Sequence, residues 1–123
     1  MDKKTVLICD DSLLIRKKLR EALDSFNFEA FYEAANGVAA VEQTKKYKPS
    51  LVFLDIVMPE IDGIEALKEI KAINPDTKVI MVSSVGTSGK LKEALKYGAY
   101  DFIQKPIQID TLVTIVERAL KEG

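Results

Sequence analysis

The sequence predicts a doubly wound α/β fold, in which helices cover both faces of a five-stranded parallel sheet. Five short apolar runs begin 23 to 27 residues apart, which is the length of one strand, one helix and two short loops. Most of these runs are continuously apolar, a pattern typical of parallel strands that are buried on both faces. Five units of this kind commonly pair in the strand order 2-1-3-4-5 and bind ligands where that order reverses, between the first and third strands.

The predicted strands are residues 5–9, 28–34, 51–55, 78–83 and 101–105. Only the second strand alternates clearly between polar and apolar residues, with Glu29 and Glu33 on one face. We therefore expect this strand at an edge of the sheet.

Helical periodicity follows each predicted strand. Apolar residues recur about every 3.6 residues over 15–26 and 109–120, and weaker patterns cover 37–47, 62–73 and 87–97. Gly37 and Gly63 begin two of these helices, and Gly98 occupies a position typical of a C-terminal helix cap. These signals agree with five alternating strand–helix units.

Composition narrows both the class of protein and its chemistry. A chain of 123 residues, 47% hydrophobic and 30% charged, is expected to fold as one domain over residues 1–123. The net charge of −1 gives no general attraction to nucleic acid or to anionic membranes, so we expect neither as a partner. The single cysteine, Cys9, cannot form an internal disulfide, and no segment resembles a membrane span or signal peptide, so the expected location is the cytoplasm. The chain has no histidine, which excludes Ser/His and Cys/His catalysis and His-ligated zinc.

Polar side chains stand at the carboxyl ends of four predicted strands, on the side where this fold binds ligands. They are Asp10 and Asp11, Asp55, Ser83 and Ser84, and Lys105. Taken singly, each has a structural explanation: Asp11 or Ser12 could cap a helix, Ser83 could be a hydrogen-bonded core hydroxyl, and Lys105 could be a solvated strand end. Their coincidence at one edge of the sheet favours a functional site.

Three carboxylates in one cleft favour a bound divalent cation, because like charges at about 4 to 6 Å raise one another's pKa. Oxygen ligands without histidine or cysteine suit Mg²⁺, or alternatively Mn²⁺, better than zinc. Such a site beside a lysine and a hydroxyl indicates phosphoryl chemistry, and a carboxylate such as Asp55 is a competent nucleophile for forming an aspartyl phosphate.

Four segments carry a resemblance to a known family. The segments LICDDS, FLDIVMPEIDG, IMVSS and DFIQKPI occur on the expected strands and in the expected order. Together they resemble the receiver domain of two-component response regulators, a flavodoxin-like (βα)5 domain, and the resemblance covers essentially the whole chain. The length is similar to that of the stand-alone chemotaxis response regulator, and a domain cut from a longer protein would look the same.

The resemblance implies a role for each site residue. Asp55 is the expected acceptor of a phosphoryl group from the phosphohistidine of a sensor histidine kinase or phosphotransfer protein. The expected Mg²⁺ ligands are Asp55 and Asp11, the backbone carbonyl of Val57, and Asp10 through a water molecule. As a receiver, the chain is not expected to be an enzyme beyond catalysing its own phosphorylation and slow dephosphorylation.

The resemblance also implies a conformational switch. Ser83 and Lys105 are expected to contact phosphoryl oxygens, and Phe102 is expected to change rotamer, which remodels the face formed by the fourth helix, fifth strand and fifth helix. That face would control a partner protein or an output domain, or form a phosphorylation-dependent dimer. Family members often have a cis peptide bond at the position of Pro106.

Two features depart from the family pattern. Phe102 stands where tyrosine is common and has no hydroxyl to form a hydrogen bond. Val57 and Val85, two residues beyond Asp55 and Ser83, are apolar where amide or acidic side chains can orient the attacking water. We therefore expect slow loss of the phosphoryl group.

Two other functions of an α/β fold are weighed against this one. An aspartyl-nucleophile phosphohydrolase is the enzymatic alternative, but such enzymes place two aspartates two residues apart after the first strand, whereas Asp10 and Asp11 are adjacent. A flavin-binding module of the same topology would need a hydroxyl-rich phosphate loop where this chain has DDSLL.

Two further motifs have simpler explanations. The segment GTSGK at 86–90 lacks the spacing of a P-loop and is expected to be a flexible loop before the fourth helix. The basic residues Arg16, Lys17, Lys18 and Arg20 are expected on the outer face of the first helix. That face is either solvated or a docking surface for the helical domain of a kinase.

Overall fold

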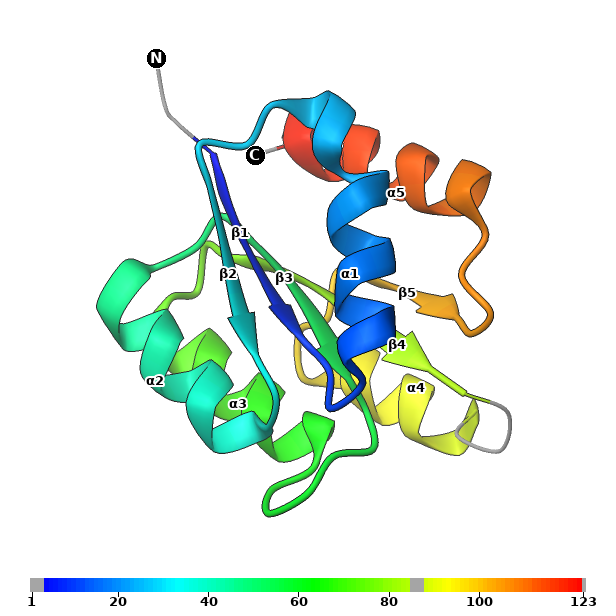
Figure 1. The fold of residues 1–123 in the computed structure, drawn as a ribbon. Helices are drawn as coiled ribbons and strands as arrows, with labels where there is room; N and C mark the ends of the chain where they lie inside the picture. Colours follow the sequence, from blue (N-terminus) through cyan, green and yellow to red (C-terminus); the bar gives the residue numbers. More distant parts are fainter. Residues whose placement is uncertain (1–3, 85–87, 123) are drawn as a thin grey trace.

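Five parallel strands form one sheet in the order β2-β1-β3-β4-β5, as the sequence predicts (Figure 1). The computed structural model describes residues 4–84 and 88–122. The strands are β1 (Thr5–Cys9), β2 (Ala30–Ala34), β3 (Leu51–Asp55), β4 (Lys78–Ser83) and β5 (Asp101–Gln104). β2 lies at one edge of the sheet and pairs with β1, in agreement with its alternating sequence.

Helices cover both faces of the sheet, which makes a three-layer sandwich (Figure 1). α1 and α5 pack on one face, and α2, α3 and α4 pack on the other. Their bounds are α1 (Leu13–Ala22), α2 (Gly37–Tyr47), α3 (Gly63–Ile73), α4 (Ser88–Lys96) and α5 (Ile109–Glu122). Within the described residues, none of these helices combines the length and the apolarity needed to cross a membrane. The fold class expected from the sequence is confirmed.

Several element boundaries differ from the sequence pattern, among them the end of the first helix, the start of the second strand and the end of the fifth strand. The first helix ends at Ala22, because the chain then forms a short 3-10 turn (Asp24–Phe26) and changes direction at Asn27, which has a left-handed backbone with φ of 56°. The second strand accordingly begins at Ala30 rather than at residue 28. β5 ends at Gln104, one residue earlier than predicted.

The central strands send apolar side chains toward both helical layers. The side chains under α1 and α5 include Val6, Ile8, Phe53, Ile80 and Val82, and those under α2, α3 and α4 include Leu7, Val52, Leu54, Val79 and Met81. All of these residues are fully buried. Burial of one such side chain stabilises the fold by about 1.5 to 3 kcal/mol. The carboxyl ends of β1, β3 and β4 are therefore firmly held, and side chains placed there have fixed positions.

A close approach between α3 and β3 requires glycine at the start of α3. A Cβ atom on Gly63 would lie 2.2 Å from the carbonyl oxygen of Asp55 and 2.7 Å from the Cα of Ile56. The Gly63 N–H donates to the carbonyl of Ile56 at 2.7 Å. Asp62 caps the helix, because its carboxylate accepts the N–H of Glu65 at 3.0 Å. These contacts set the start of α3 against the end of β3.

Candidate functional site

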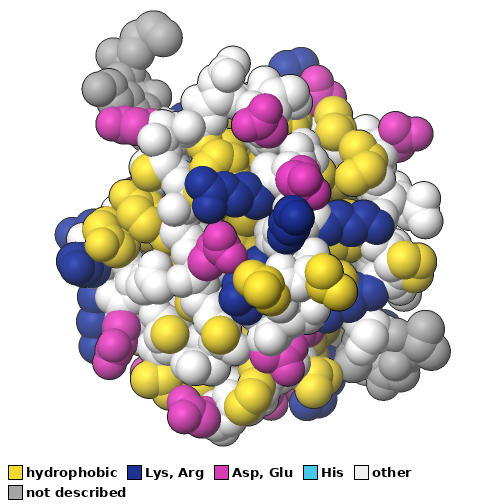
Figure 2. All heavy atoms as spheres, viewed as in Figure 1, with side chains coloured by type: hydrophobic (Ala, Val, Ile, Leu, Met, Phe, Trp, Pro, Cys, Tyr) yellow, Lys and Arg dark blue, Asp and Glu magenta, His cyan; other side chains and the backbone are white. Residues whose placement is uncertain are grey.

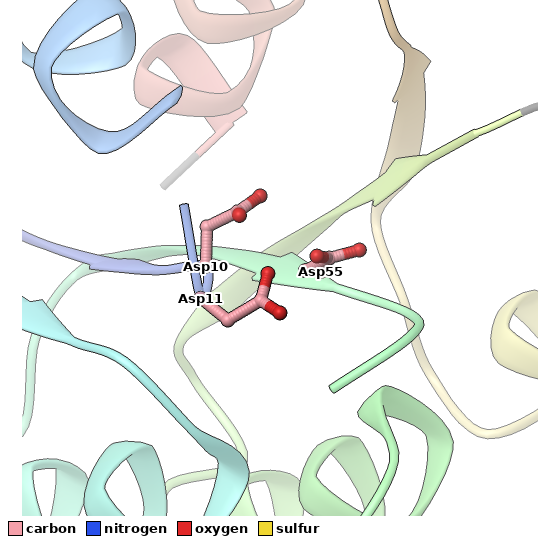
Figure 3. Close-up of side chains that lie close together, drawn as sticks. All are labelled: Asp10, Asp11 and Asp55. Carbon is pink, nitrogen blue, oxygen red and sulfur yellow. The ribbon is translucent and has the colours of Figure 1, made fainter. Parts of the chain in front are cut away.

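Asp10, Asp11 and Asp55 lie together at the carboxyl edge of the sheet (Figure 3). Asp55 ends β3 and Asp10 follows β1, and these neighbouring strands are in register through the pair Cys9↔Leu54. Each carboxylate offers an oxygen within 4.8 Å of the others. Asp10 is fully buried, Asp55 is 5% exposed and Asp11 is exposed to solvent. The structure thus brings together the three carboxylates that the sequence predicts in one cleft.

The start of α1 is capped by Ser12 and not by Asp11. The Ser12 hydroxyl accepts the N–H of Ile15 at 3.3 Å, and the Ser12 N–H donates to Oδ1 of Asp10 at 2.8 Å. The N–H of Asp10 donates to the carbonyl of Ala34 on β2 at 3.1 Å. Because Ser12 supplies the cap, the carboxylate of Asp11 is available to the acidic cluster.

Lys105 places one positive charge between two of the carboxylates. Its Nζ lies 3.0 Å from Oδ2 of Asp10 and 3.4 Å from Oδ2 of Asp55. The backbone N–H of Lys105 donates to the carbonyl of Ser83 at 2.7 Å. The peptide bond between Lys105 and Pro106 is cis, as the resemblance implies. Burial alone would lower the pKa of the Lys105 ammonium, but the contacts with Asp10 and Asp55 outweigh burial and raise that pKa. Lys105 is therefore held in its charged form.

One ammonium does not balance three acids, and the imbalance affects Asp55. Burial, followed by repulsion from Asp10, raises the pKa of the Asp55 carboxyl from 3.8 to about 6. Lys105 and the Val57 N–H, which donates to Oδ1 of Asp55 at 3.3 Å, lower this pKa only in part. A further cation would stabilise the ionised cluster.

The donor atoms fit a hard divalent cation. Among the described residues, the buried Oδ2 of Asp10 has no hydrogen bond of normal geometry, so its contact with Lys105 is an ion pair that leaves lone pairs for a ligand. The acidic donors are carboxylate oxygens, which suit Mg²⁺ or Mn²⁺. Cys9 is buried with its Sγ 3.3 Å from Sδ of Met58, and burial raises the pKa of its thiol to about 12. A thiolate-bound metal such as zinc is therefore disfavoured.

Ser83 and Phe102 lie on the strands beyond Asp55. Ser83 ends β4, and the residue before it pairs with Asp55. The Ser83 side chain is buried, and its hydroxyl donates to the carbonyl of Ile103 at 3.5 Å. Phe102 is half-buried and packs against the apolar layer under α2, α3 and α4. In this structure Ser83 is therefore a hydrogen-bonded hydroxyl of the sheet, and Val85 lies outside the described residues.

The family of the chain follows from its similarity to known proteins. The family model for the response regulator receiver domain matches residues 6–117. The chain belongs to the response regulator receiver family. This receiver is 44% identical over 116 residues to chemotaxis protein CheY of Listeria monocytogenes, and the match covers 94% of this chain and 98% of that relative.

Solved structures of receiver domains share the fold of this chain. The receiver domain of AraT, a response regulator from Geobacillus stearothermophilus, has a TM-score of 0.91 at 27% identity and covers 98% of this chain and 95% of that one. A chain of the CheX–CheY–BeF3–Mg²⁺ complex from Borrelia burgdorferi has a TM-score of 0.88 at 34% identity, with 95% of this chain and 89% of that one covered.

The protein is therefore a receiver of the CheY type, which is a phosphorylation-regulated signalling switch of two-component systems. The receiver family binds Mg²⁺ at an acidic pocket, and Asp10, Asp11 and Asp55 form that pocket's acidic cluster in this chain.

The sequence pattern misplaces Arg16. It predicts this residue on the outer face of α1, but the Arg16 side chain is only 15% exposed. Nη1 of Arg16 donates to the carbonyl of Asp10 at 2.6 Å, and Nε donates to the Glu33 carboxylate at 2.9 Å. The prediction was wrong for Arg16 because Glu33, on β2 beside α1, attracts its guanidinium inward. Glu33 was the available signal, since an acid on a strand beside α1 can pair with basic residues of that helix.

Proposed function

We propose that this receiver takes one phosphoryl group onto Asp55 from a phosphohistidine of a sensor histidine kinase or phosphotransfer protein, in a reaction that requires Mg²⁺. The acidic cluster carries the proposal: it combines a carboxylate nucleophile, one ammonium and a negative charge that a divalent cation would balance. In the transfer, an Asp55 carboxylate oxygen bonds to phosphorus, the phosphorus–nitrogen bond breaks, and the imidazole of the donor leaves.

Each neighbour of Asp55 has a role in this proposal. Asp10, Asp11, Asp55 and the Val57 carbonyl would hold Mg²⁺, or Mn²⁺ in its place. When bound, the cation supplies neutralisation of charge on the phosphoryl oxygens. Lys105 already lies 3.4 Å from Asp55, so its ammonium can follow the added charge from the carboxylate to a phosphoryl oxygen.

The switch would act through Ser83. Its hydroxyl holds the carbonyl of Ile103 at 3.5 Å, a long hydrogen bond that a phosphoryl oxygen would replace with a stronger, charge-assisted one. Because Ile103 and Phe102 are adjacent on β5, loss of that bond frees the strand to shift and Phe102 to change rotamer. The face formed by α4, β5 and α5 would then control a partner protein or an output domain, or form a phosphorylation-dependent dimer.

The face that carries α1 is the proposed docking surface for the phosphodonor. Leu13 and Leu14, at the start of α1 beside Asp11, are 67% and 78% exposed. Lys17 and Lys18 are exposed on the same helix, and Figure 2 shows hydrophobic side chains among charged ones on this face. Such a surface suits the apolar and acidic side chains of a helical kinase domain. We also propose that the chain acts in the cytoplasm as one receiver module over residues 1–123. Its net charge of −1 gives no general attraction to nucleic acid or to anionic membranes, so neither is proposed as a partner.

The phosphohydrolase alternative fits the site less well. Such an enzyme would use a nucleophile after the first strand, but Asp10 is fully buried there. Its Oδ1 accepts the Ser12 N–H, and its Oδ2 pairs with Lys105. A buried carboxylate with these contacts is poorly placed to attack a phosphate ester as the nucleophile.

Incubation with Mg²⁺ and acetyl phosphate tests the proposed function. We expect the intact mass to increase by one phosphoryl group per chain, and we expect no increase for Asp55→Asn or in excess chelator. Repeated turnover of phosphate esters, with no stable adduct, would instead support the phosphohydrolase.

A further inference from the structure

We propose that Arg16 is a positioning residue for the acidic pair, because it holds the peptide group that joins Asp10 to Asp11. This inference rests on the proposed Mg²⁺ site and assigns a role to a side chain outside the acidic cluster. Arg16 acts through the two aspartates and is not itself a ligand, since its guanidinium is a cation.

The contacts of Arg16 reach both sides of its guanidinium. Nη1 donates to the carbonyl oxygen of Asp10 at 2.6 Å, and Nε donates to Oε1 of Glu33 at 2.9 Å. Both bonds are short, and that to Glu33 is between two charged groups, which strengthens it. The side chain of Arg16 is 15% exposed, so water competes weakly for these bonds.

The Asp10 carbonyl is the point where this bond matters most. On its amino side, Asp10 is held by its backbone N–H, which donates to the carbonyl oxygen of Ala34 on β2. On its carboxyl side, the carbonyl belongs to the peptide bond with Asp11, and its orientation sets the direction in which the Asp11 carboxylate points. If the peptide group turns, the Asp11 carboxylate moves away from Asp10 and Asp55. Arg16 is therefore placed to keep the three carboxylates within reach of one cation.

Glu33 makes a cation tolerable at this position. It offsets the positive charge of Arg16, so the guanidinium restrains the peptide group without fully cancelling the negative charge of the metal site. Glu33 is itself held, because its backbone carbonyl accepts the Gln43 side-chain amide at 2.6 Å. A connected set of bonds thus runs from α2, through the edge strand β2, to the acidic cluster.

Arg20 provides a matched control on the same helix. Its Nη1 lies 3.4 Å from Oε2 of Glu33, and its side chain is 55% exposed. It shares a partner with Arg16 and has the same charge, but it donates a hydrogen bond to the Glu33 carboxylate and not to the Asp10 carbonyl. A structural role for the ion pairs with Glu33 would affect both arginines, whereas, of the two, it is Arg16 that donates to the Asp10 carbonyl.

The test measures Mn²⁺ binding by electron paramagnetic resonance, with Mg²⁺ as a competitor, on purified wild-type and variant chains. Arg16→Met is expected to weaken Mn²⁺ binding about ten-fold or more, which is the effect typical of removing a residue that hydrogen-bonds to a metal ligand. Arg20→Met is expected to stay within about two-fold of wild type, as a solvent-exposed ion pair should. Arg16→Lys should be intermediate, because an ammonium cannot reproduce the two-sided contact of a guanidinium.

A double-mutant cycle separates positioning from a general loss of structure. If Arg16 acts through Asp11, then Arg16→Met should weaken Mn²⁺ binding much less in an Asp11→Asn background. Should Arg16→Met fail to fold, Arg16→Lys and Glu33→Gln give the same test, since each is expected to weaken binding several-fold. Equal Mn²⁺ affinity in wild type, Arg16→Met and Arg20→Met would overturn this inference alone. A wild-type chain that binds neither Mn²⁺ nor Mg²⁺ would overturn both this inference and the metal requirement of the proposed function.

Discussion

Replacing Asp55 with asparagine should stabilise the metal-free protein at neutral pH, although it removes the proposed phosphoacceptor. Asp55 is 5% exposed and lies beside Asp10, so its ionised form is disfavoured in the fold. The pKa of the Asp55 carboxyl is raised from 3.8 to about 6, mainly by burial and then by the charge of Asp10. Asparagine keeps the size and hydrogen-bonding capacity of the side chain without the charge.

The size and the pH window of this effect follow from the shifted pKa. One pKa unit corresponds to about 1.4 kcal/mol, so ionising Asp55 in the fold costs on the order of 3 kcal/mol more than in the unfolded chain. Because the pKa is higher in the folded state, the stability contributed by protonated Asp55 is fully present below pH 3.8 and is lost as pH rises through about 6. The difference between Asp55→Asn and wild type should therefore be near zero at low pH and largest above pH 7.

Denaturant and thermal unfolding in the presence of a chelator measure this difference. At pH 8 the variant should exceed wild type by about 3 kcal/mol, which is roughly 10 °C in melting temperature for a chain of this length. Added Mg²⁺ should then stabilise wild type by mass action and stabilise the variant much less.

Asp62 is the control with the opposite sign. The pKa of its carboxyl is lowered, mainly because it accepts the N–H of Glu65 at the start of α3. Its ionised form therefore supports folding at neutral pH, and this support is lost as pH falls through its pKa in the folded state. Asp62→Asn should slightly reduce stability at pH 8. If Asp55→Asn is no more stable than wild type at pH 8 without metal, the account of charge imbalance in the cluster is refuted.

Three other predictions concern the loop after β3 and the ammonium of the site. Gly63→Ala should reduce the free energy of unfolding by about 3 kcal/mol, because the added Cβ would lie 2.2 Å from the Asp55 carbonyl oxygen. Gly89→Ala should raise the free energy of unfolding by about 0.5 kcal/mol, because its added Cβ would have no neighbouring atom within 4 Å. Chemical denaturation measures both variants, and equal effects would contradict the close approach of α3 to β3. Val57→Asn should speed loss of the phosphoryl group from Asp55, because an amide can orient water where the 56% exposed valine cannot; an unchanged half-life of the phosphorylated protein would count against this. Lys105→Met should tighten Mg²⁺ binding several-fold, because it removes an ammonium that lies 3.4 Å from Oδ2 of Asp55. The same variant should be phosphorylated more slowly. Weaker Mg²⁺ binding by the variant in a calorimetric titration would contradict the expected gain in affinity.

The sheet and the acidic cluster could be predicted from the sequence because both depend on local patterns. Continuously apolar runs identify buried parallel strands, and the residue after each run marks a strand end. Once the strand order is expected, Asp10 and Asp55 must be neighbours, since they follow adjacent strands. Lys105 follows from the same reasoning, and its position 3.0 Å from Asp10 agrees with it.

Other features depend on choices that the sequence leaves open. Asp11 and Ser12 are both good helix caps, and only the backbone geometry at the start of α1 shows that Ser12 takes that role. The inward turn of Arg16 depends on where β2 places Glu33, which is a contact between residues distant in sequence. The start of β2 at Ala30 depends on the left-handed Asn27, a conformation that asparagine permits but does not require.

The central claim is that Asp55 carries the phosphoryl group, and reductive trapping of the phosphorylated protein tests it most directly. Borohydride converts an aspartyl phosphate into homoserine with loss of phosphate, so peptide mapping identifies the modified residue. After incubation with Mg²⁺ and acetyl phosphate, we predict homoserine at position 55 and unchanged aspartate at positions 10 and 11. Homoserine at position 10 or 11, or a phosphorylated chain with aspartate intact at position 55, would contradict the assignment.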